Sequence, residues 1–114
     1  MNGKTTLHDM TDEIVEHPLM AVLVKAIQQA TTGKGERHGG NKTPFLDQPW
    51  AHYAEMHGRG FLTGQAAKKL EEAASTREGE AFINEMLGAI CYCGMAVIKE
   101  WQSNISDEKK IRST

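Results

Sequence analysis

The sequence contains only two cysteines and little net charge. Cys91 and Cys93 are two residues apart inside a helical pattern, where such positions point to nearly opposite sides. They are therefore poorly placed to bridge each other or to chelate one metal ion together, and we expect reduced, buried thiols. The formal net charge of −2 lacks the broad basic field that binds nucleic acid or anionic lipid, so a nucleic-acid partner is not expected.

A long apolar run is also missing. Residues 1–10 do not contain the apolar core of a signal peptide. The longest uncharged apolar stretch covers residues 86–98, whereas a membrane-spanning helix needs ~20 residues. We therefore expect residues 86–98 to form a buried helix, in a cytoplasmic protein with no membrane partner.

No stretch alternates between apolar and polar residues as a strand does, and no internal repeat is present. The sequence predicts an all-α fold: a small bundle of about four helices in one domain, residues 1–114. The helices are expected at residues 18–30, 49–57, 64–74 and 77–102, with loose ends at 1–10 and 103–114. Thr63 is expected to cap the third helix, and Ser75 with Glu78 has the spacing of a capping box for the fourth.

The predicted helix 77–102 is apolar around more of its circumference than a small monomer can easily cover. Its apolar residues recur at three- and four-residue steps, and glycine and alanine form a second side that another helix could approach closely. An apolar face of this size marks an interface. We expect a homodimer or tetramer built on this helix.

Residues 31–49 form an unusually long loop, with four glycines and two prolines. The loop lacks the residue order of a P-loop and no strand precedes it. Its basic residues could still contact a triphosphate. The candidate phosphate-binding residues are Lys34, Arg37, Arg59 and Lys68.

Residues 63–100 carry the segment KKLEEA, a turn, and then NEMLGAICYCGMAVIK. This arrangement resembles the MazG-like, all-α nucleoside triphosphate pyrophosphohydrolases, in which two successive helices carry E-x-x-E and E-x-x-D motifs whose carboxylates bind magnesium. The matching residues are Lys69, Leu70, Glu71 and Glu72 in the first helix and Glu85, Met86, Leu87 and Gly88 in the second.

The resemblance implies a possible Mg²⁺ ion held by Glu71, Glu72 and Glu85, with Glu72 and Glu85 as catalytic residues and a deoxynucleotide or modified nucleotide as substrate. The second carboxylate of each family motif is replaced here, by Ser75 or Ala74 and by Gly88 or Ala89. These losses favour an alternative, a non-catalytic oligomeric binding or interaction module on the same scaffold. A third alternative is a helical protein that acts on a macromolecular partner.

Each candidate also has a purely structural interpretation. Glu71 follows two lysines in a helix, as a solvated charged face does, and Glu85 lies near a helix N-terminus, where the helix dipole favours negative charge. His52 and His57 are five residues apart, not the four that H-E-x-x-H requires. Whether they bind metal stays open beside the alternative of surface histidines flanking a buried Trp50 and Tyr53.

Overall fold

The computed structural model describes residues 7–33, 43–76 and 78–113, with the side chains of 12–31, 43–76 and 78–104. The described residues form five α-helices and contain no strand: α1 (Leu7–Glu16), α2 (Pro18–Gln28), α3 (Pro49–His57), α4 (Arg59–Ser75) and α5 (Glu80–Ser113). A π-helical turn, Gln29–Gly33, extends α2, and a 3-10 turn, Phe45–Asp47, precedes α3. The all-α prediction is confirmed.

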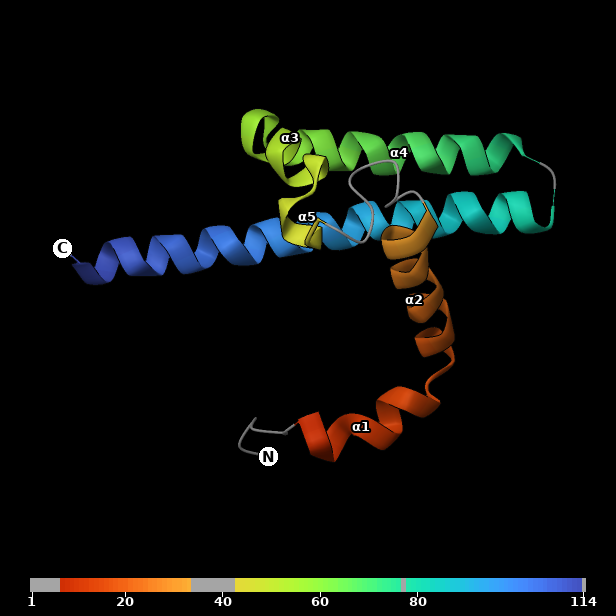
Figure 1. Cartoon of the computed structure of the whole chain (residues 1–114), viewed down its shortest axis with the longest axis horizontal. Coiled ribbons are helices and arrows are strands. Elements are labelled where there is room, and N and C mark those ends of the chain that lie inside the picture. Colours follow the sequence, from red (N-terminus) through yellow and green to blue (C-terminus); the bar gives the residue numbers. More distant parts are fainter. Residues whose placement is uncertain (1–6, 34–42, 77, 114) are drawn as a thin grey trace.

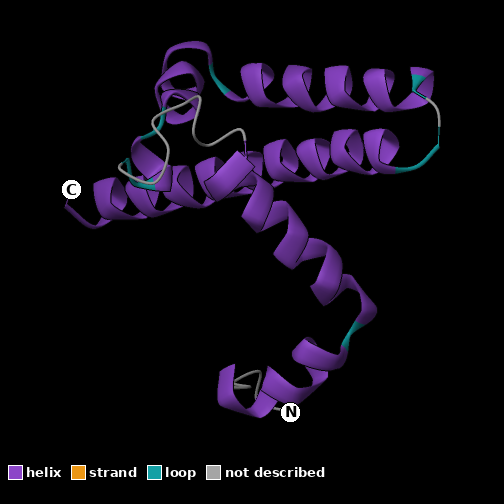
Figure 2. Ribbon diagram, turned by 45° about the vertical axis from the view of Figure 1, so that its right-hand side comes forward, coloured by secondary structure: helices purple, strands orange, loops and turns teal. Residues whose placement is uncertain are grey.

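The centre of the fold is a hairpin of two long helices, α4 and α5, which lie side by side (Figures 1 and 2). The buried side of α4 consists of residues at four- and three-residue steps, as one face of a helix requires: Leu62, Ala66, Lys69 and Ala73. Gly79 joins the two helices with a φ of 95°, a left-handed conformation that favours glycine.

Helix α3 folds back against this hairpin. Gly58, with a φ of 75°, separates α3 from α4 and so sets the angle between them. The core lies at this corner, where Trp50, Ala54, Leu62 and Met95 pack together. The Trp50 indole also packs at a tilt of 43° against the Phe45 ring, with ring centroids 5.2 Å apart, and its Nε1 donates a hydrogen bond to the Phe45 carbonyl oxygen at 2.9 Å.

Helices α1 and α2 leave the hairpin as an arm (Figures 1 and 2). His17 caps α2, because its Nδ1 accepts a hydrogen bond from the Leu19 amide at 3.1 Å, and Pro18 takes the first helical position. The end of α2 joins α5, where Ala26 is buried and its carbonyl oxygen accepts a hydrogen bond from the Cys91 thiol at 3.2 Å.

Several predicted boundaries were wrong. Residues 7–10 lie in α1 and residues 103–113 lie in α5, and the predicted loop 31–49 contains the end of the π-helical turn and the 3-10 turn. Thr63 lies inside α4, where its hydroxyl donates to the Gly60 carbonyl oxygen. The Ser75 hydroxyl donates back to the Glu72 carbonyl oxygen, so it ends α4 instead of capping α5.

The stretch 86–98 is helical but only partly buried. Leu87, Ala89 and Met95 lie in the interior, whereas Val97 is 47% exposed, and the Cys93 thiol is exposed instead of buried as expected. By length and composition alone, Glu80–Asn104 is apolar enough to cross a membrane, although the core helix of a soluble protein passes the same test. Its exposed apolar side is therefore the feature that needs an explanation.

Candidate functional site

Two of the predicted carboxylates meet across the hairpin, with a lysine between them. The Lys69 ammonium lies 3.4 Å from Glu85 Oε2 and 3.5 Å from Glu72 Oε2. We call these three residues the Lys69 cluster. Lys69 and Glu72 belong to α4 and Glu85 belongs to α5, so the cluster forms only because the two helices pack together. The Lys69 side chain is 11% exposed and the Glu85 side chain 23%, which makes the pair partly buried.

A glycine on α5 makes room for the lysine stem. A Cβ atom at Gly88 would lie 3.1 Å from Lys69 Cδ and 3.4 Å from Cε. The bare backbone at this position therefore lets the aliphatic part of Lys69 cross the helix interface and bring its ammonium to Glu85. Gly88 stands where the resemblance would place a carboxylate, so the chain has space for a lysine at that point.

The environment of Glu72 favours its ionised form. A hydrogen bond with the Glu85 carboxyl, followed by the attraction of the Lys69 and Lys68 ammonium groups, lowers the pKa of Glu72 below its ordinary value. Two carboxyl groups this close repel each other when both are ionised, and Lys69 offsets that repulsion. The cluster is thus a compact arrangement of one ammonium group and two carboxyl groups.

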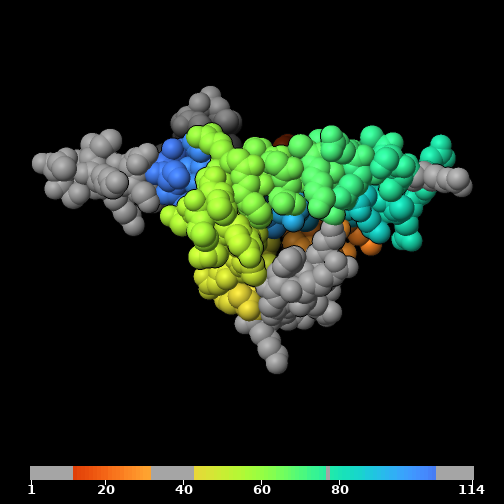
Figure 3. All heavy atoms as spheres, turned by 90° about the horizontal axis from the view of Figure 1, so that it is seen from above, coloured from red at the N-terminus to blue at the C-terminus, as the bar shows by residue number. Residues whose placement is uncertain are grey.

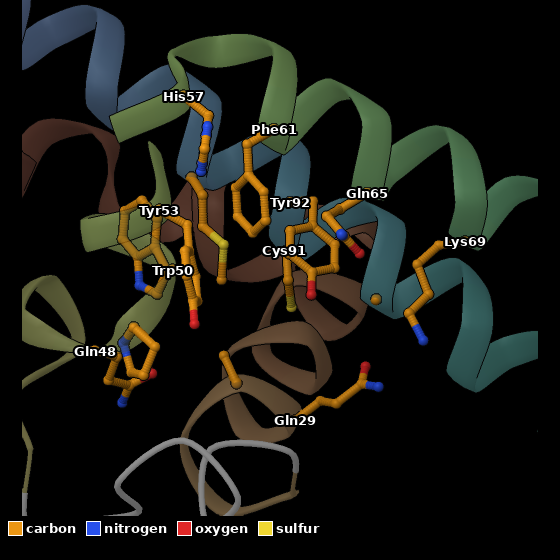
Figure 4. A pocket seen from close by; sticks show the side chains of 14 residues that line it. Gln29, Gln48, Trp50, Tyr53, His57, Phe61, Gln65, Lys69, Cys91 and Tyr92 are labelled. Carbon is orange, nitrogen blue, oxygen red and sulfur yellow. The ribbon is translucent and has the colours of Figure 1, made fainter. Parts of the chain in front are cut away.

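A cavity of about 450 Å³ adjoins the Lys69 cluster. Its lining comes from the π-helical turn Gln29–Gly33, from Gln48 and α3, and from α4 and α5. In the space-filling view atoms of α3 and α4 stand in front of α5 (Figure 3). Figure 4 shows aromatic side chains on one side and Gln29, Gln65 and Lys69 on the other. The aromatic lining consists of Trp50, Tyr53, Phe61 and Tyr92.

One polar atom in this lining is buried without a hydrogen bond. Gln29 Nε2 donates to the Asn84 carbonyl oxygen at 3.2 Å, but Gln29 Oε1 accepts no hydrogen bond from the described part of the chain. A buried acceptor left unpaired costs about 1–3 kcal/mol. A donor on a ligand in the cavity would remove that cost.

Of the other predicted residues, Lys68 lies at the exposed edge of this cluster and Arg59 lies elsewhere. Arg59 lies against Glu100, 3.6 Å away, and lines a different hollow. Lys68 is 65% exposed and lies 3.9 Å from Glu72 Oε1, and Glu71 is exposed on α4. Lys34 and Arg37 lie outside the described residues.

The histidine candidates are also apart from the Lys69 cluster. His52 and His57 are exposed, and only His57 lines the cavity. Glu55, on the same helix, pairs with Lys99: its Oε2 accepts a hydrogen bond from the Lys99 ammonium at 2.8 Å, and that hydrogen bond lowers the Glu55 pKa. Trp50 is buried as expected, whereas Tyr53 is 46% exposed at the cavity.

Two carboxylates, and not three, are therefore available to a metal ion at this site. Within the described ranges no group of three or more His, Cys, Asp or Glu side chains is placed to hold one. Mg²⁺ often takes only one or two protein carboxylates, with water and substrate phosphate completing its shell. Glu72 and Glu85 fit that number, but the Lys69 ammonium lies against the same oxygens and would compete with the ion.

Sequence reasoning found Glu72 and Glu85 but missed Lys69 and the cavity. The KKLEEA pattern suggested a solvated charged face, in which Lys69 is adjacent to Lys68 and carries the same charge. Gln29, Gln48 and Gln65 lie in the π-helical turn, just before α3 and in α4, and they follow no motif. The one available signal was helical spacing, because Lys69 continues the apolar series of Leu62, Ala66 and Ala73.

No protein-family model matches the chain, and neither the curated proteins nor the solved structures contain a significant match to it.

Proposed function

We propose that this protein binds a nucleotide in the cavity, on a scaffold similar to that of the MazG-like proteins. The observation that carries the proposal is an aromatic cavity of about 450 Å³ whose lining includes Lys69, the lysine paired with Glu85. Small-molecule sites are typically concave, mostly apolar pockets of about 300–1,000 Å³ with a few well-placed polar groups. The cavity has that size and that composition.

The lining suits a flat heterocyclic ring. Trp50, Tyr53, Phe61 and Tyr92 offer aromatic surface, and stacking of a base on an aromatic side chain is worth about 1–3 kcal/mol. Gln29 and Gln65 carry amide groups that both donate and accept hydrogen bonds. The unpaired Gln29 Oε1 gives a ligand N–H group a specific partner.

Phosphate groups would meet Lys69. Lys69 is one of the residues that line the cavity, and its ammonium lies in the Lys69 cluster. The Glu72 and Glu85 carboxyl groups of that cluster would repel a phosphate, since the single charge of Lys69 neutralises only one of them. A nucleotide therefore binds well only if a further cation joins it or if its phosphates stay on the side of Lys69 away from Glu72 and Glu85.

A second candidate function is pyrophosphate release from a nucleoside triphosphate, and the meeting of Glu72 and Glu85 favours it. These two carboxylates would hold one Mg²⁺ ion, with Glu71 exposed nearby on α4. When bound, Mg²⁺ polarises phosphates and lowers the pKa of a coordinated water. Lys69 would bind and orient the phosphates, and the aromatic walls would exclude water from the base.

Binding without catalysis is the alternative on the same residues. Lys69 already offsets the charge that a metal ion would offset, and the second carboxylate of each family motif is absent. A nucleotide ligand agrees in either case with the cytoplasmic location predicted from the sequence.

One experiment separates the candidates through Glu85→Gln. Calorimetry and a pyrophosphate assay would follow a panel of nucleoside and deoxynucleoside triphosphates, with and without Mg²⁺. If the protein is a hydrolase, binding and release require Mg²⁺ and Glu85→Gln abolishes release. If it only binds, Glu85→Gln tightens binding several-fold without metal, because it removes a negative charge beside the phosphates.

The two lysines provide a matched pair of variants. Lys69→Gln should weaken nucleotide binding by roughly tenfold, equivalent to about 1.4 kcal/mol. Lys68→Gln removes the same charge one residue away, from a side chain that does not line the cavity, and should change binding less than twofold. No saturable binding of any triphosphate, or equal losses in the two variants, would refute the proposal.

A further inference from the structure

The side of α5 turned away from α4 carries an apolar series that the described residues cover only in part: Met86 and Ile90 are half-buried, and the other members are exposed. Its members recur every three or four positions and so lie on one side of the helix. They are Ile83, Met86, Ile90, Cys93, Val97 and Trp101, which we call the outer face. Val97 follows Gly88 by nine residues, which is two and a half turns, so the outer face is opposite the side that meets Lys69.

The outer face is well exposed in the single chain. Ile83 is 51% exposed, Val97 47% and Trp101 64%. Ile83, Ile90 and Val97 are spaced by seven residues, the repeat that places β-branched side chains along the seam between two packed helices. The outer face therefore has the pattern of a helix–helix contact and not of scattered surface residues.

The whole chain also exposes too much surface for a monomer of its size. Its accessible area is 8879 Å² for 12.6 kDa, where a compact monomer would expose about 6,200 Å². Its radius of gyration is 16.6 Å, against about 13 Å for a compact domain of this length. Ile83, Val97 and Trp101 on the outer face contribute to this exposed area, and a standard interface buries ~800 Å² on each partner.

We infer that a second copy of this chain covers the outer face, so that the two α4–α5 hairpins form a four-helix bundle. Two-fold homodimers are the commonest oligomers, and their interface uses the same patch on both copies. The outer face suits self-association because its six residues carry no charge. The pairing supplies the second hydrophobic layer that one hairpin lacks.

A lipid bilayer is the competing occupant, because Glu80–Asn104 has the length and composition of a membrane span. A spanning helix is in contact with lipid or with apolar neighbours along its length. Helix α5 is instead packed along α4, and immersing it would bring Lys68, Glu71 and Glu72 toward lipid at about 2.5–3.5 kcal/mol per charged residue near the bilayer centre. The charged helix α4 favours the second copy.

The test compares two equally exposed apolar residues. Val97→Glu places a charge on the outer face, and Leu70→Glu places one on α4 at a side chain that is 49% exposed. Sedimentation velocity at micromolar concentration should show a dimer for the wild type and for Leu70→Glu. Val97→Glu should remain helical by circular dichroism and self-associate at least tenfold more weakly.

A second measurement uses the wild type alone and does not depend on how a variant folds. The Cys93 thiol, which lies on the outer face, should react with a thiol reagent more slowly as the protein concentration rises through the dimerisation range. A wild-type monomer throughout that range, or dimers of equal strength in both variants, would overturn the inference. Flotation of the wild type with phosphatidylcholine–phosphatidylglycerol vesicles, lost in Val97→Glu, would assign the face to lipid and would overturn it too.

Discussion

Replacing Lys69 with methionine tests whether the Lys69 cluster stabilises the fold. Methionine keeps the aliphatic stem that packs over Gly88 and removes only the charge. At 3.4 Å from Glu85 Oε2, the ammonium attracts that carboxylate by about 5 kcal/mol at an effective dielectric constant of ~20, before the cost of desolvating both groups. Breaking a fully buried pair costs about 3–5 kcal/mol.

The expected loss for Lys69→Met is smaller, about 2 kcal/mol, because Glu85 keeps 23% of its side-chain exposure. In thermal unfolding at one fixed protomer concentration, this corresponds to a decrease in Tm of about 8 °C. Adding Glu85→Gln should restore about half of the lost stability, since it removes one of the two carboxylates left facing each other.

The control is Lys68→Met, from a side chain that is 65% exposed and 3.9 Å from Glu72 Oε1. Exposed pairs of this kind contribute about 0–1 kcal/mol, so its Tm should stay within about 2 °C of the wild type. A Tm for Lys69→Met that equals the Tm of this control would show that the ammonium is not a stabilising part of the hairpin, and the account of the cluster would be wrong.

Three further predictions concern the packing and the charges of the hairpin. Gly64→Ala should raise the free energy of unfolding by about 0.5–1 kcal/mol in urea titrations, because alanine favours a helix and the new Cβ atom meets nothing within 4 Å. Gly88→Ala should raise the free energy of unfolding less, because the Lys69 stem must shift to admit the new Cβ atom. Leu62→Ala, at a side chain with 0% exposure, should lower it by about 2–5 kcal/mol in the same assay; a smaller loss would place Leu62 outside the core. Because the pKa values of Glu72 and Glu55 are lowered in the folded state, their contribution is present above the ordinary glutamate pKa and is lost as the pH falls below it. The urea midpoint should thus decrease between about pH 5 and pH 3, less steeply in a Glu72→Gln, Glu55→Gln double variant; an unchanged slope would contradict those shifts.

The amino-acid sequence by itself determined the fold class and most of the helices. Periodicity of 3.6 residues is a local property, so α2, α3 and the core of α5 were predictable, and Pro18 and Pro49 marked two of their starts. Helix ends were less predictable because capping groups compete: the Ser75 hydroxyl bonded back to Glu72 instead of forward to α5. Glu72 and Glu85 were found because the resemblance rests on short motifs.

Only the tertiary structure decided which of these residues meet. Lys68 and Lys69 are equivalent in sequence, but the register of α4 on α5 turns Lys69 toward Gly88 and Glu85 and leaves Lys68 in solvent. The same register places Arg59 beside Glu100, far along α5 from Glu85. The cavity needed Gln29, Trp50, Gln65 and Tyr92 from four elements. Contacts between residues distant in sequence depend on how whole helices pack, and no local pattern encodes that packing.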